Sequence, residues 1–195
     1  MRNIILASTS IYRKQLLEKL SIPFECIKPD VDESAYKNKL YRPKEIAEKL
    51  SALKANTVLE TRADAVVIGS DQVIQLDGEI FSKPKTIENA IRQLKKMRGK
   101  THELISGVTI ATKSKSITFS HSTFLTLRAD LLDSEIEYYV KKDEPLFCAG
   151  SYMIENLGIA LFSEVKTTDF NSIIGLPLID LITHLKKFDI HPLRQ

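Results

Sequence analysis

The hydrophobic positions of the chain follow two different periods, and these predict alternating strands and helices. Continuous apolar runs at residues 4–7 and 65–69 predict buried strands over residues 3–7 and 65–69, because a strand covered on both faces carries few polar side chains. Apolar side chains at helical spacing predict helices over residues 11–20 and 43–59. Ser10 directly precedes the first helix, where a hydroxyl side chain is a favourable N-cap.

The rest of the chain continues this mixture of strands and helices. The Asp77-Gly78 pair between two short apolar runs predicts a β-hairpin. Ser134 and Glu137 have the spacing of a capping box that opens a further helix. Other strands are expected at residues 24–27, 102–112, 116–126 and within 148–162, and other helices at 86–97 and 178–188. The fold class is therefore α/β or α+β with a mixed sheet, in a single domain of residues 1–195.

Composition and charge indicate an ordinary globular protein. Of the 195 residues, 43% are hydrophobic and 27% are charged, and the formal net charge is only +3, which does not favour a nucleic-acid partner. The sequence has no 18-residue apolar stretch for a membrane span and no signal segment, so we expect a cytoplasmic protein. Cys26 and Cys148 lie far apart without a CxxC motif, so two reduced, buried thiols are expected.

Two common catalytic signatures do not fit the sequence. Gly99-Lys100-Thr101 resembles the end of a P-loop, but Leu94 stands where that pattern requires glycine. A P-loop also runs from strand to helix, whereas here a predicted helix precedes a predicted strand. The four histidines are scattered along the sequence, so no histidine metal cluster is predicted.

The segment LASTSIYRK at residues 6–14 is a candidate anion site. It passes from a predicted strand into a predicted helix, and such a turn presents free N–H groups and the positive end of the helix dipole. Ser8 and Ser10 add hydroxyl donors, and Arg13 lies in the first turn, where a cation is unfavourable unless an anion binds there. The alternative interpretation is an ordinary capped helix with a solvated arginine.

Carboxylates and lysines at element ends extend the candidate chemistry. Asp71 follows the apolar run 65–69, and open α/β sheets bind ligands beyond the carboxyl ends of their strands. Glu33 lies beside Asp32 in a polar loop, and such carboxylates suit Mg²⁺ or Mn²⁺. Lys54 lies near the apolar face of its helix, and Lys83 follows the hairpin. The alternatives are solvated loop carboxylates and lysine stems that cover apolar surface. Together, these charges match the needs of phosphoanhydride cleavage.

At this point the sequence resembles the Maf-like family of nucleoside triphosphate pyrophosphatases. The resemblance runs nearly end to end. It rests, in order, on LASTS with Arg13, Val31-Asp32-Glu33, Lys54-Ala55, Gly69-Ser70-Asp71, Lys83-Pro84, Ala149-Gly150-Ser151 and Gly175-Leu176-Pro177-Leu178. It implies an elongated mixed sheet with flanking helices, with two lobes around a central cleft, as in Maf and ITPase-like proteins. It also implies a homodimer, and the family's association with septum formation leaves a nucleotide-binding regulator as an alternative.

The resemblance implies roles for the candidate residues. A divalent cation, Mg²⁺ or Mn²⁺, would assist hydrolysis of a nucleoside triphosphate between its α and β phosphates. By similarity, Asp71 would accept the proton of the attacking water, and Glu33 and Asp71 would hold the metal. Lys54, Lys83 and Arg13 would bind phosphate, assisted by Ser8 and Ser10. The family usually has proline at position 11 and arginine at position 14, where this chain has Ile11 and Lys14.

Three further positions indicate which nucleotide is used. One branch of the family prefers 7-methyl-GTP and has tryptophan, glutamine and glutamate where this chain has Tyr12, Gln72 and Glu155. The branch that prefers dTTP and UTP has arginine, threonine and glutamine there. A 7-methylguanine ring is cationic, so an aromatic face and a carboxylate both attract it. The sequence therefore favours 7-methyl-GTP, with dTTP and UTP as the alternative substrates.

Overall fold

The computed structural model describes residues 3–33, 36 and 41–194. The chain forms two compact units, each built from separate stretches of sequence. Unit 1 comprises Met1–Gln72, Ser106–His121 and Asp169–Gln195, and unit 2 comprises Val73–Ile105 and Ser122–Thr168.

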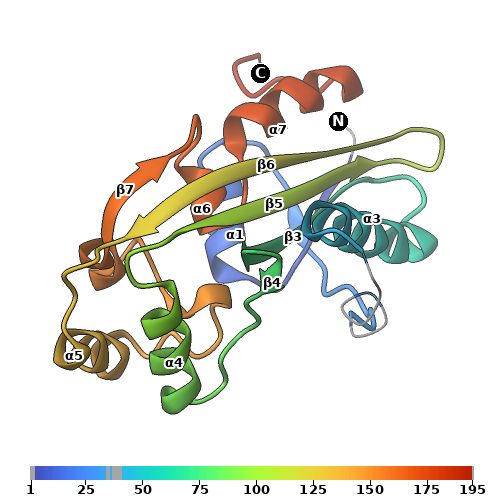
Figure 1. The fold of residues 1–195 in the computed structure, drawn as a ribbon. Helices are drawn as coiled ribbons and strands as arrows, with labels where there is room; N and C mark the ends of the chain where they lie inside the picture. Colours follow the sequence, from blue (N-terminus) through green and yellow to red (C-terminus); the bar gives the residue numbers. More distant parts are fainter. Residues whose placement is uncertain (1–2, 34–35, 37–40, 195) are drawn as a thin grey trace. The chain divides into compact units, whose positions relative to one another are not determined.

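One seven-stranded sheet runs through the chain in the order β2-β1-β3-β5-β6-β7, and β4 pairs with β3 (Figure 1). Its strands are β1 Ile4–Ala7, β2 Glu25–Cys26, β3 Val66–Leu76, β4 Glu79–Ile80, β5 Thr101–Ala111, β6 Ser116–Leu127 and β7 Phe162–Lys166. β1 pairs in parallel with β2 and with β3, whereas β4 pairs antiparallel with β3 and β7 antiparallel with β6. The mixed sheet and its helices confirm the predicted α/β class.

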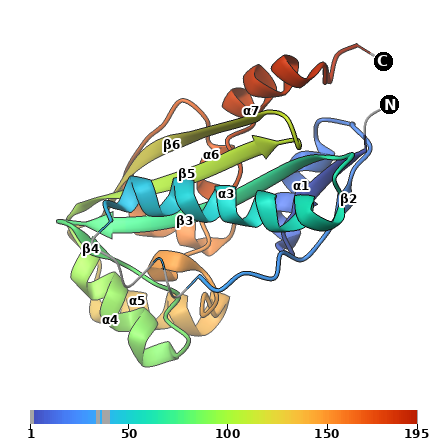
Figure 2. The same cartoon turned by 90° about the vertical axis from the view of Figure 1, so that its right-hand side faces the viewer.

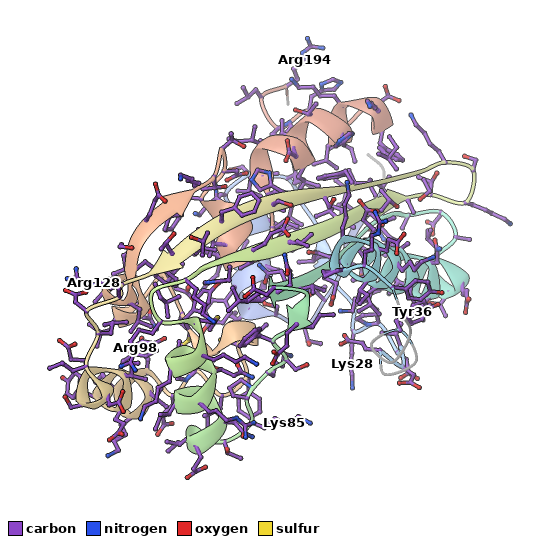
Figure 3. The ribbon with its side chains drawn as sticks, viewed as in Figure 1. Lys28, Tyr36, Lys85, Arg98, Arg128 and Arg194 are labelled. Atoms are coloured by element: carbon purple, nitrogen blue, oxygen red, sulfur yellow. The ribbon has the colours of Figure 1, made fainter. Side chains whose placement is uncertain are left out.

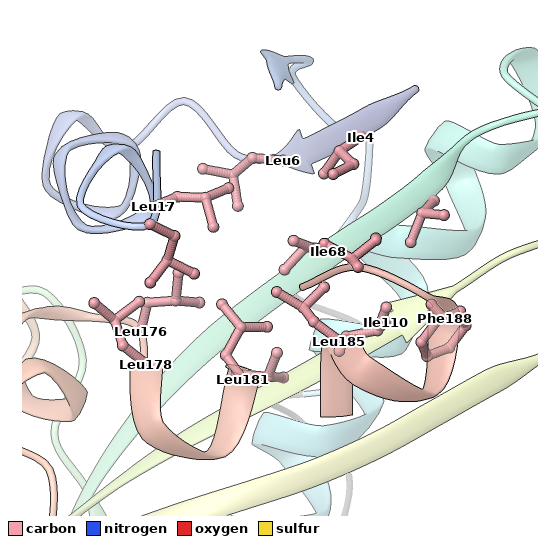
Figure 4. Packing of buried hydrophobic residues seen from close by; sticks show 14 of the residues in the cluster. Ile4, Leu6, Leu17, Ile68, Ile110, Leu176, Leu178, Leu181, Leu185 and Phe188 are labelled. Carbon is pink, nitrogen blue, oxygen red and sulfur yellow. The ribbon is translucent and has the colours of Figure 1, made fainter. Parts of the chain in front are cut away.

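The two faces of β1 lie in different parts of the core of unit 1. Ile4 and Leu6 pack in one cluster with residues of helix α1, Ile11–Glu18, and helix α7, Leu178–Leu185 (Figure 4). Ile5 and Ala7 pack in a second cluster with Ala55 and Val58 of helix α3, Pro43–Thr61. Alternate strand residues point to opposite faces, so a strand covered on both faces must be apolar throughout.

Helix α3 packs closely against β3 and β5 because two glycines leave room for its backbone. A Cβ atom at Gly69 would lie 2.2 Å from the Ser51 carbonyl oxygen, and one at Gly107 would lie 2.4 Å from the Ala47 carbonyl oxygen. Figure 2 shows α3 running along β3. The Ser51 hydroxyl lies 2.9 Å from the Thr109 hydroxyl of β5, so the contact also contains a buried hydrogen bond. This packing sets the distance between α3 and the middle of β3.

In unit 2, helix α4, Ile87–Met97, packs against helix α5, Asp133–Asp143. Arg98, labelled in Figure 3, lies at the end of α4, and its Nη1 donates to the Leu131 carbonyl and to Asp133 Oδ1. The Thr86 hydroxyl accepts from the Asn89 N–H at 3.2 Å, so Thr86 is the N-cap of α4. Among the described residues, no helix combines the length and hydrophobicity that crossing a membrane requires.

Some local predictions for unit 2 are wrong. Residues 148–162 contain two 3₁₀ helices, Ala149–Ser151 and Leu157–Leu161, rather than strands. Gly150 has φ of +72°, which ends extended backbone at that point. The capping box is also displaced, because α5 begins after Leu132 and the Glu135 carboxylate accepts from the Leu132 N–H at 2.7 Å. The Asp77-Gly78 hairpin is confirmed, with positive φ at both residues.

Candidate functional site

A buried lysine between two carboxylates forms the centre of the candidate site in unit 1. Lys54 Nζ lies 2.6 Å from Asp71 Oδ1 and 2.8 Å from Glu33 Oε1. The side chains of Lys54 and Asp71 are only 9% and 10% exposed, whereas that of Glu33 is 35% exposed. A buried ammonium is stable only when opposite charges accompany it, and here two carboxylates do. The structure therefore brings together three of the predicted catalytic residues.

Helix α3 and strand β3 position this group. Lys54 follows Ser51 by three residues, so both side chains lie on the same face of the helix. Ser51 is held against β5 by its bond to Thr109, and the backbone at Ser51 and Ala55 is in contact with Gly69 of β3. Lys54 is thereby directed at the part of β3 that immediately follows Gly69. Its position near the apolar helix face, predicted from sequence, is confirmed by its burial.

Asp71 lies inside β3 rather than beyond its carboxyl end, so that part of the prediction is wrong. The strand runs without a break from Val66 to Leu76. Its polar residues remain in the sheet because each finds a partner: the Ser70 hydroxyl donates to the Gly175 carbonyl at 3.1 Å, and Gln72 Nε2 donates to the Ser172 and Ile173 carbonyls. Buried polar groups that are hydrogen-bonded do not end a strand.

The predicted cap at the start of α1 is confirmed. The Ser10 hydroxyl accepts from the Arg13 N–H at 3.4 Å, and the Ser8 hydroxyl accepts from the Ser10 N–H at 3.1 Å. Both serine oxygens therefore hold the turn in place as acceptors, and each hydroxyl still carries a hydrogen to donate. Ser8 is buried beside the end of β1. The turn thus combines a fixed backbone with two hydroxyl groups that can donate to an anion.

Arg13 is held by backbone carbonyls rather than by solvent. Its Nη1 donates to the Ser70 carbonyl at 2.9 Å and its Nε to the Gly175 carbonyl at 3.2 Å. Burial lowers the pKa of the Arg13 guanidinium, and the nearby charges of Asp71 and Glu33 oppose that shift. The alternative of a solvated arginine is therefore wrong. A guanidinium carries five N–H donors, so this arrangement leaves others to bind an anion.

The three positions that bear on nucleotide identity lie in different settings. Gln72 uses its amide nitrogen for the Ser172 and Ile173 carbonyls and for the Ser106 hydroxyl, which leaves its side-chain oxygen as the remaining acceptor. Tyr12 is half-buried at the second position of α1. Glu155 belongs to unit 2, where it is exposed after the first 3₁₀ helix.

The charges of Lys83 and Glu155 both affect the thiol of Cys148 in unit 2. The pKa of Cys148 is raised to about 11, chiefly by burial and also by the Glu155 charge, while the Lys83 charge opposes the shift. The neighbouring Lys85, labelled in Figure 3, donates its N–H to the Leu146 carbonyl at 3.0 Å. Cys148 is partly buried, but Cys26 is exposed, so its predicted burial is wrong.

The carboxylates of Glu33 and Asp71 are the groups that fit a divalent cation. They lie on either side of the Lys54 ammonium, and carboxylate oxygens are the ligands that Mg²⁺ prefers. Within residues 3–33, 36 and 41–194, no group of three or more His, Cys, Asp or Glu side chains forms a metal site. Mg²⁺ commonly binds through one or two carboxylates together with substrate phosphates and water, so two carboxylates fit that type of site.

Residues 169–175 were missed as part of this site. Gly175 belongs to a motif that the sequence shares with the Maf-like family, but nothing in the sequence assigned it a function. Its carbonyl oxygen accepts hydrogen bonds from both Arg13 and Ser70. Its φ is +142°, a backbone conformation that glycine adopts readily and other residues rarely do. A Cβ atom at Gly175 would lie 3.1 Å from Arg13 Cγ. The glycine therefore permits the contact that positions the arginine.

The chain is similar to known proteins over most of its length. A family model described as Maf-like protein matches residues 3–188. The chain is 42% identical to a 7-methyl-GTP pyrophosphatase of Vibrio parahaemolyticus, covering 94% of each chain, and 40% identical to a dTTP/UTP pyrophosphatase of Bacillus cereus, covering 97% of each. The solved Ham1 protein of Staphylococcus aureus has a TM-score of 0.55 at 14% identity, covering 97% of this chain and 100% of that one, which indicates a shared fold. The chain therefore belongs to the Maf-like protein family.

Proposed function

We propose that this protein is a nucleoside triphosphate pyrophosphatase that hydrolyses 7-methyl-GTP to 7-methyl-GMP and pyrophosphate. The observation that carries the proposal is the buried Asp71 carboxylate beside the Lys54 ammonium, with Glu33 on the other side of the amine. Its relatives from Vibrio parahaemolyticus and Bacillus cereus are both named as pyrophosphatases, so the reaction type is common to both comparisons.

Asp71 is the proposed proton acceptor. A water molecule attacks the α phosphorus, its oxygen forms the new bond to phosphorus, and the bond from the α phosphorus to the bridging oxygen breaks. Asp71 takes the proton from the water, and pyrophosphate leaves with the bonding electron pair. Lys54 keeps one carboxylate oxygen of Asp71 in a fixed direction, which leaves the other oxygen for the water.

Charge on the triphosphate is offset by the cations of the site. Arg13 offers guanidinium donors from a fixed position, and the hydroxyls of Ser8 and Ser10 add neutral donors at the start of α1. By similarity to the family, Lys83 is another cation proposed to bind the phosphates. Glu33 and Asp71 are the residues that would hold a Mg²⁺ or Mn²⁺ ion, which when bound offsets phosphate charge and polarises the reacting phosphoryl group.

The choice of 7-methyl-GTP rests on Tyr12, Gln72 and Glu155. The 7-methylguanine ring carries a positive charge, which favours an aromatic face and a carboxylate. Glu155 can also accept from the N1–H and the amino group of guanine, a pair of donors that uracil and thymine lack. Gln72 retains its side-chain oxygen as an acceptor, because its amide nitrogen is already bonded to backbone carbonyls.

A panel of nucleotides tests the proposed substrate. The purified protein is incubated with Mg²⁺ or Mn²⁺ and with 7-methyl-GTP, GTP, UTP or dTTP, and pyrophosphate release is measured. We expect kcat/KM to be highest for 7-methyl-GTP. Faster turnover of UTP or dTTP than of 7-methyl-GTP would replace our substrate assignment with the alternative one.

Two substitutions test the proposed roles within that reaction. Asp71→Asn is expected to abolish hydrolysis while nucleotide binding is largely retained, because the amide keeps the shape of the side chain but does not take up a proton. Glu155→Gln is expected to lower kcat/KM for 7-methyl-GTP by about tenfold more than that for UTP, since it removes the charge that favours the cationic ring. Glu164→Gln, an exposed glutamate of β7, is the control.

A further inference from the structure

A buried carboxylate outside the proposed catalytic group ties together both ends of one segment of unit 1. Asp169 is only 3% exposed. Its Oδ1 accepts from the Asn171 N–H at 2.9 Å and from Asn171 Nδ2 at 2.8 Å, and its Oδ2 accepts from the Ile179 N–H at 2.8 Å. Asn171 begins helix α6, Asn171–Ile174, and Ile179 lies in the first turn of α7. One carboxylate thus joins two helix starts that are eight residues apart in sequence.

The carbonyl oxygens between those two points bind the residues around Asp71. The Gly175 oxygen accepts from the Ser70 hydroxyl at 3.1 Å and from Arg13 Nε at 3.2 Å. The Ser172 oxygen accepts from Gln72 Nε2 at 3.0 Å. Ser70 and Gln72 are the sequence neighbours of Asp71, so this segment holds the strand on both sides of the proposed proton acceptor. It also holds the arginine proposed to bind phosphate.

These carbonyl groups can bind side chains outside α6, because the helix is only four residues long. The last carbonyls of a helix have no partner within the helix, and here side chains of α1 and β3 supply the partners. The chain then turns at Gly175, whose N–H donates to the Asn171 carbonyl at 3.1 Å. The directions of these carbonyl groups therefore depend on how the two ends of the segment are held.

We propose that Asp169 is a positioning residue that acts on the site through the carbonyls of residues 172–175. Its carboxylate fixes the start of α6 and the start of α7, and this orients the Gly175 and Ser172 carbonyls toward Arg13 and Gln72. The consequence for catalysis rests on the proposed function, whereas the consequence for the Arg13 side chain does not. Asp169 itself touches no reacting atom.

Asp169→Asn tests the inference with little change of shape. The substituted amide presents an NH₂ group to N–H donors, so one end of the segment loses its acceptor. We expect kcat/KM to fall by about tenfold or more, because small displacements of binding groups have large effects on rate. Phe188→Leu is the control, since it removes buried volume from the core of unit 1 and leaves the side chain of Asp169 and the groups bonded to it unsubstituted. Its kcat/KM is expected to change by less than about twofold at a temperature where both variants are folded.

A direct readout of Arg13 separates positioning from general destabilisation. Its Nε–H donates to Gly175, so its side-chain NMR signal is expected to be protected from exchange with water, and Arg13→Lys identifies that signal by removing it. Asp169→Asn is expected to abolish the protection, and Phe188→Leu to retain it. In the Arg13→Lys background, Asp169→Asn should raise KM by no more than about twofold.

The outcomes are distinguishable. Retained protection of the Arg13 signal in Asp169→Asn overturns the inference, even if the wild-type protein hydrolyses 7-methyl-GTP. If the wild-type protein does not hydrolyse 7-methyl-GTP but Asp169→Asn still loses the protection, the proposed function is overturned and the inference is supported. An equal loss of protection in Phe188→Leu overturns the inference. If Asp169→Asn does not fold, Asn171→Ala takes its place. It removes the 2.8 Å bond from Asn171 Nδ2 to Asp169 and the exposed 3.2 Å bond that Lys19 Nζ donates to Asn171 Oδ1. A two- to fivefold loss of kcat/KM with weaker protection is then expected.

Discussion

Lys54 Nζ lies 2.6 Å from Asp71 Oδ1, and the same nitrogen lies 2.8 Å from Glu33 Oε1. One ammonium therefore neutralises two carboxylates that would otherwise repel each other. Lys54 Nζ binds the carboxylate oxygens of Glu33 and Asp71, which are also the atoms that would attract a second cation. Lys54 is thus a structural counter-ion, and a divalent cation proposed to bind the same carboxylates would have to compete with it.

Lys54→Met is expected to destabilise the protein and to increase its response to divalent cations. Removing one partner of a buried ion pair costs about 3 kcal/mol, because the carboxylates remain without their counter-ion. Binding of Mg²⁺ to those carboxylates should restore part of that loss, since a ligand specific for the folded state stabilises it. Thermal unfolding with and without Mg²⁺ measures both effects.

Two comparisons control this prediction. Lys54→Arg keeps the charge, so its unfolding temperature should respond to Mg²⁺ as that of the wild-type protein does. Asp71→Asn with Lys54→Met removes one of the two carboxylates and should reduce the Mg²⁺ response. An equal Mg²⁺ shift in all three proteins would mean that the cation binds elsewhere.

Gly69→Ala is expected to lower both stability and activity by moving α3. Its Cβ would lie 2.2 Å from the Ser51 carbonyl oxygen, which is backbone and cannot turn aside. Such overpacking costs on the order of 3 kcal/mol. Because Lys54 lies one turn after Ser51, we also expect a loss of about tenfold or more in kcat. Chemical denaturation and steady-state kinetics test the two effects.

Gly107→Ala is the matched control for that displacement. Its Cβ would meet the Ala47 carbonyl oxygen at 2.4 Å, which is a similar clash with the same helix. Ala47 lies about 10 Å from Lys54 along the helix axis, so the loss of stability should resemble that of Gly69→Ala and the loss of kcat should be smaller. If kcat falls equally in Gly69→Ala and Gly107→Ala, both substitutions act through the loss of stability alone.

His102 is expected to make the protein sensitive to acid. It is buried, its Nε2 lies 3.0 Å from the Tyr152 hydroxyl, and its Nδ1 has no hydrogen-bond partner among the described residues. Burial lowers its pKa to about 4 from 6.5, so the folded protein releases this proton more readily than the unfolded chain. The neutral imidazole therefore contributes full stability above pH 6.5, and this is lost as the pH falls toward 4.

The size of that acid effect is about 3 kcal/mol between pH 6.5 and pH 4. Urea denaturation at several pH values measures it. His102→Gln retains a polar side chain but does not titrate in this range, so its free energy of unfolding should decrease less over the same interval. The prediction is wrong if the two proteins lose stability in parallel.

Cys148 is expected to react slowly with alkylating reagents at neutral pH. Its pKa of about 11 leaves little thiolate, which is the reactive form. In a Cys26→Ser protein, the alkylation rate should rise with pH well beyond pH 9. Lys83→Gln should slow the reaction at a given pH, and Glu155→Gln should accelerate it, because the two charges act on the thiol in opposite directions. If neither variant changes the rate, the charges of Lys83 and Glu155 do not act on the Cys148 thiol.

Local patterns in the sequence were sufficient for most of the secondary structure. Apolar runs and helical spacing identify β1, α3, α4 and α7, because burial of one face or two leaves a regular trace in neighbouring residues. The same reasoning placed strands at residues 148–162, where the positive φ of Gly150 and the tight approach of Gly158 to the Met153 carbonyl produce 3₁₀ helices. Apolar residues around glycines do not distinguish these two outcomes.

The sequence by itself determined which kinds of side chain are available for chemistry, through the serines and arginine near the N-terminus, the acidic residues and the two lysines. Only the tertiary structure decided how they are used. Arg13 binds the Gly175 carbonyl across 162 positions of sequence, and Gln72 binds Ser172 across 100. Contacts of this kind join backbone groups that every residue carries, so no residue type marks them in advance. Such contacts of Ser70 and Gln72 also allow β3 to continue through Asp71. The apolar pattern does not reveal them, so it predicts that the strand ends at residue 69.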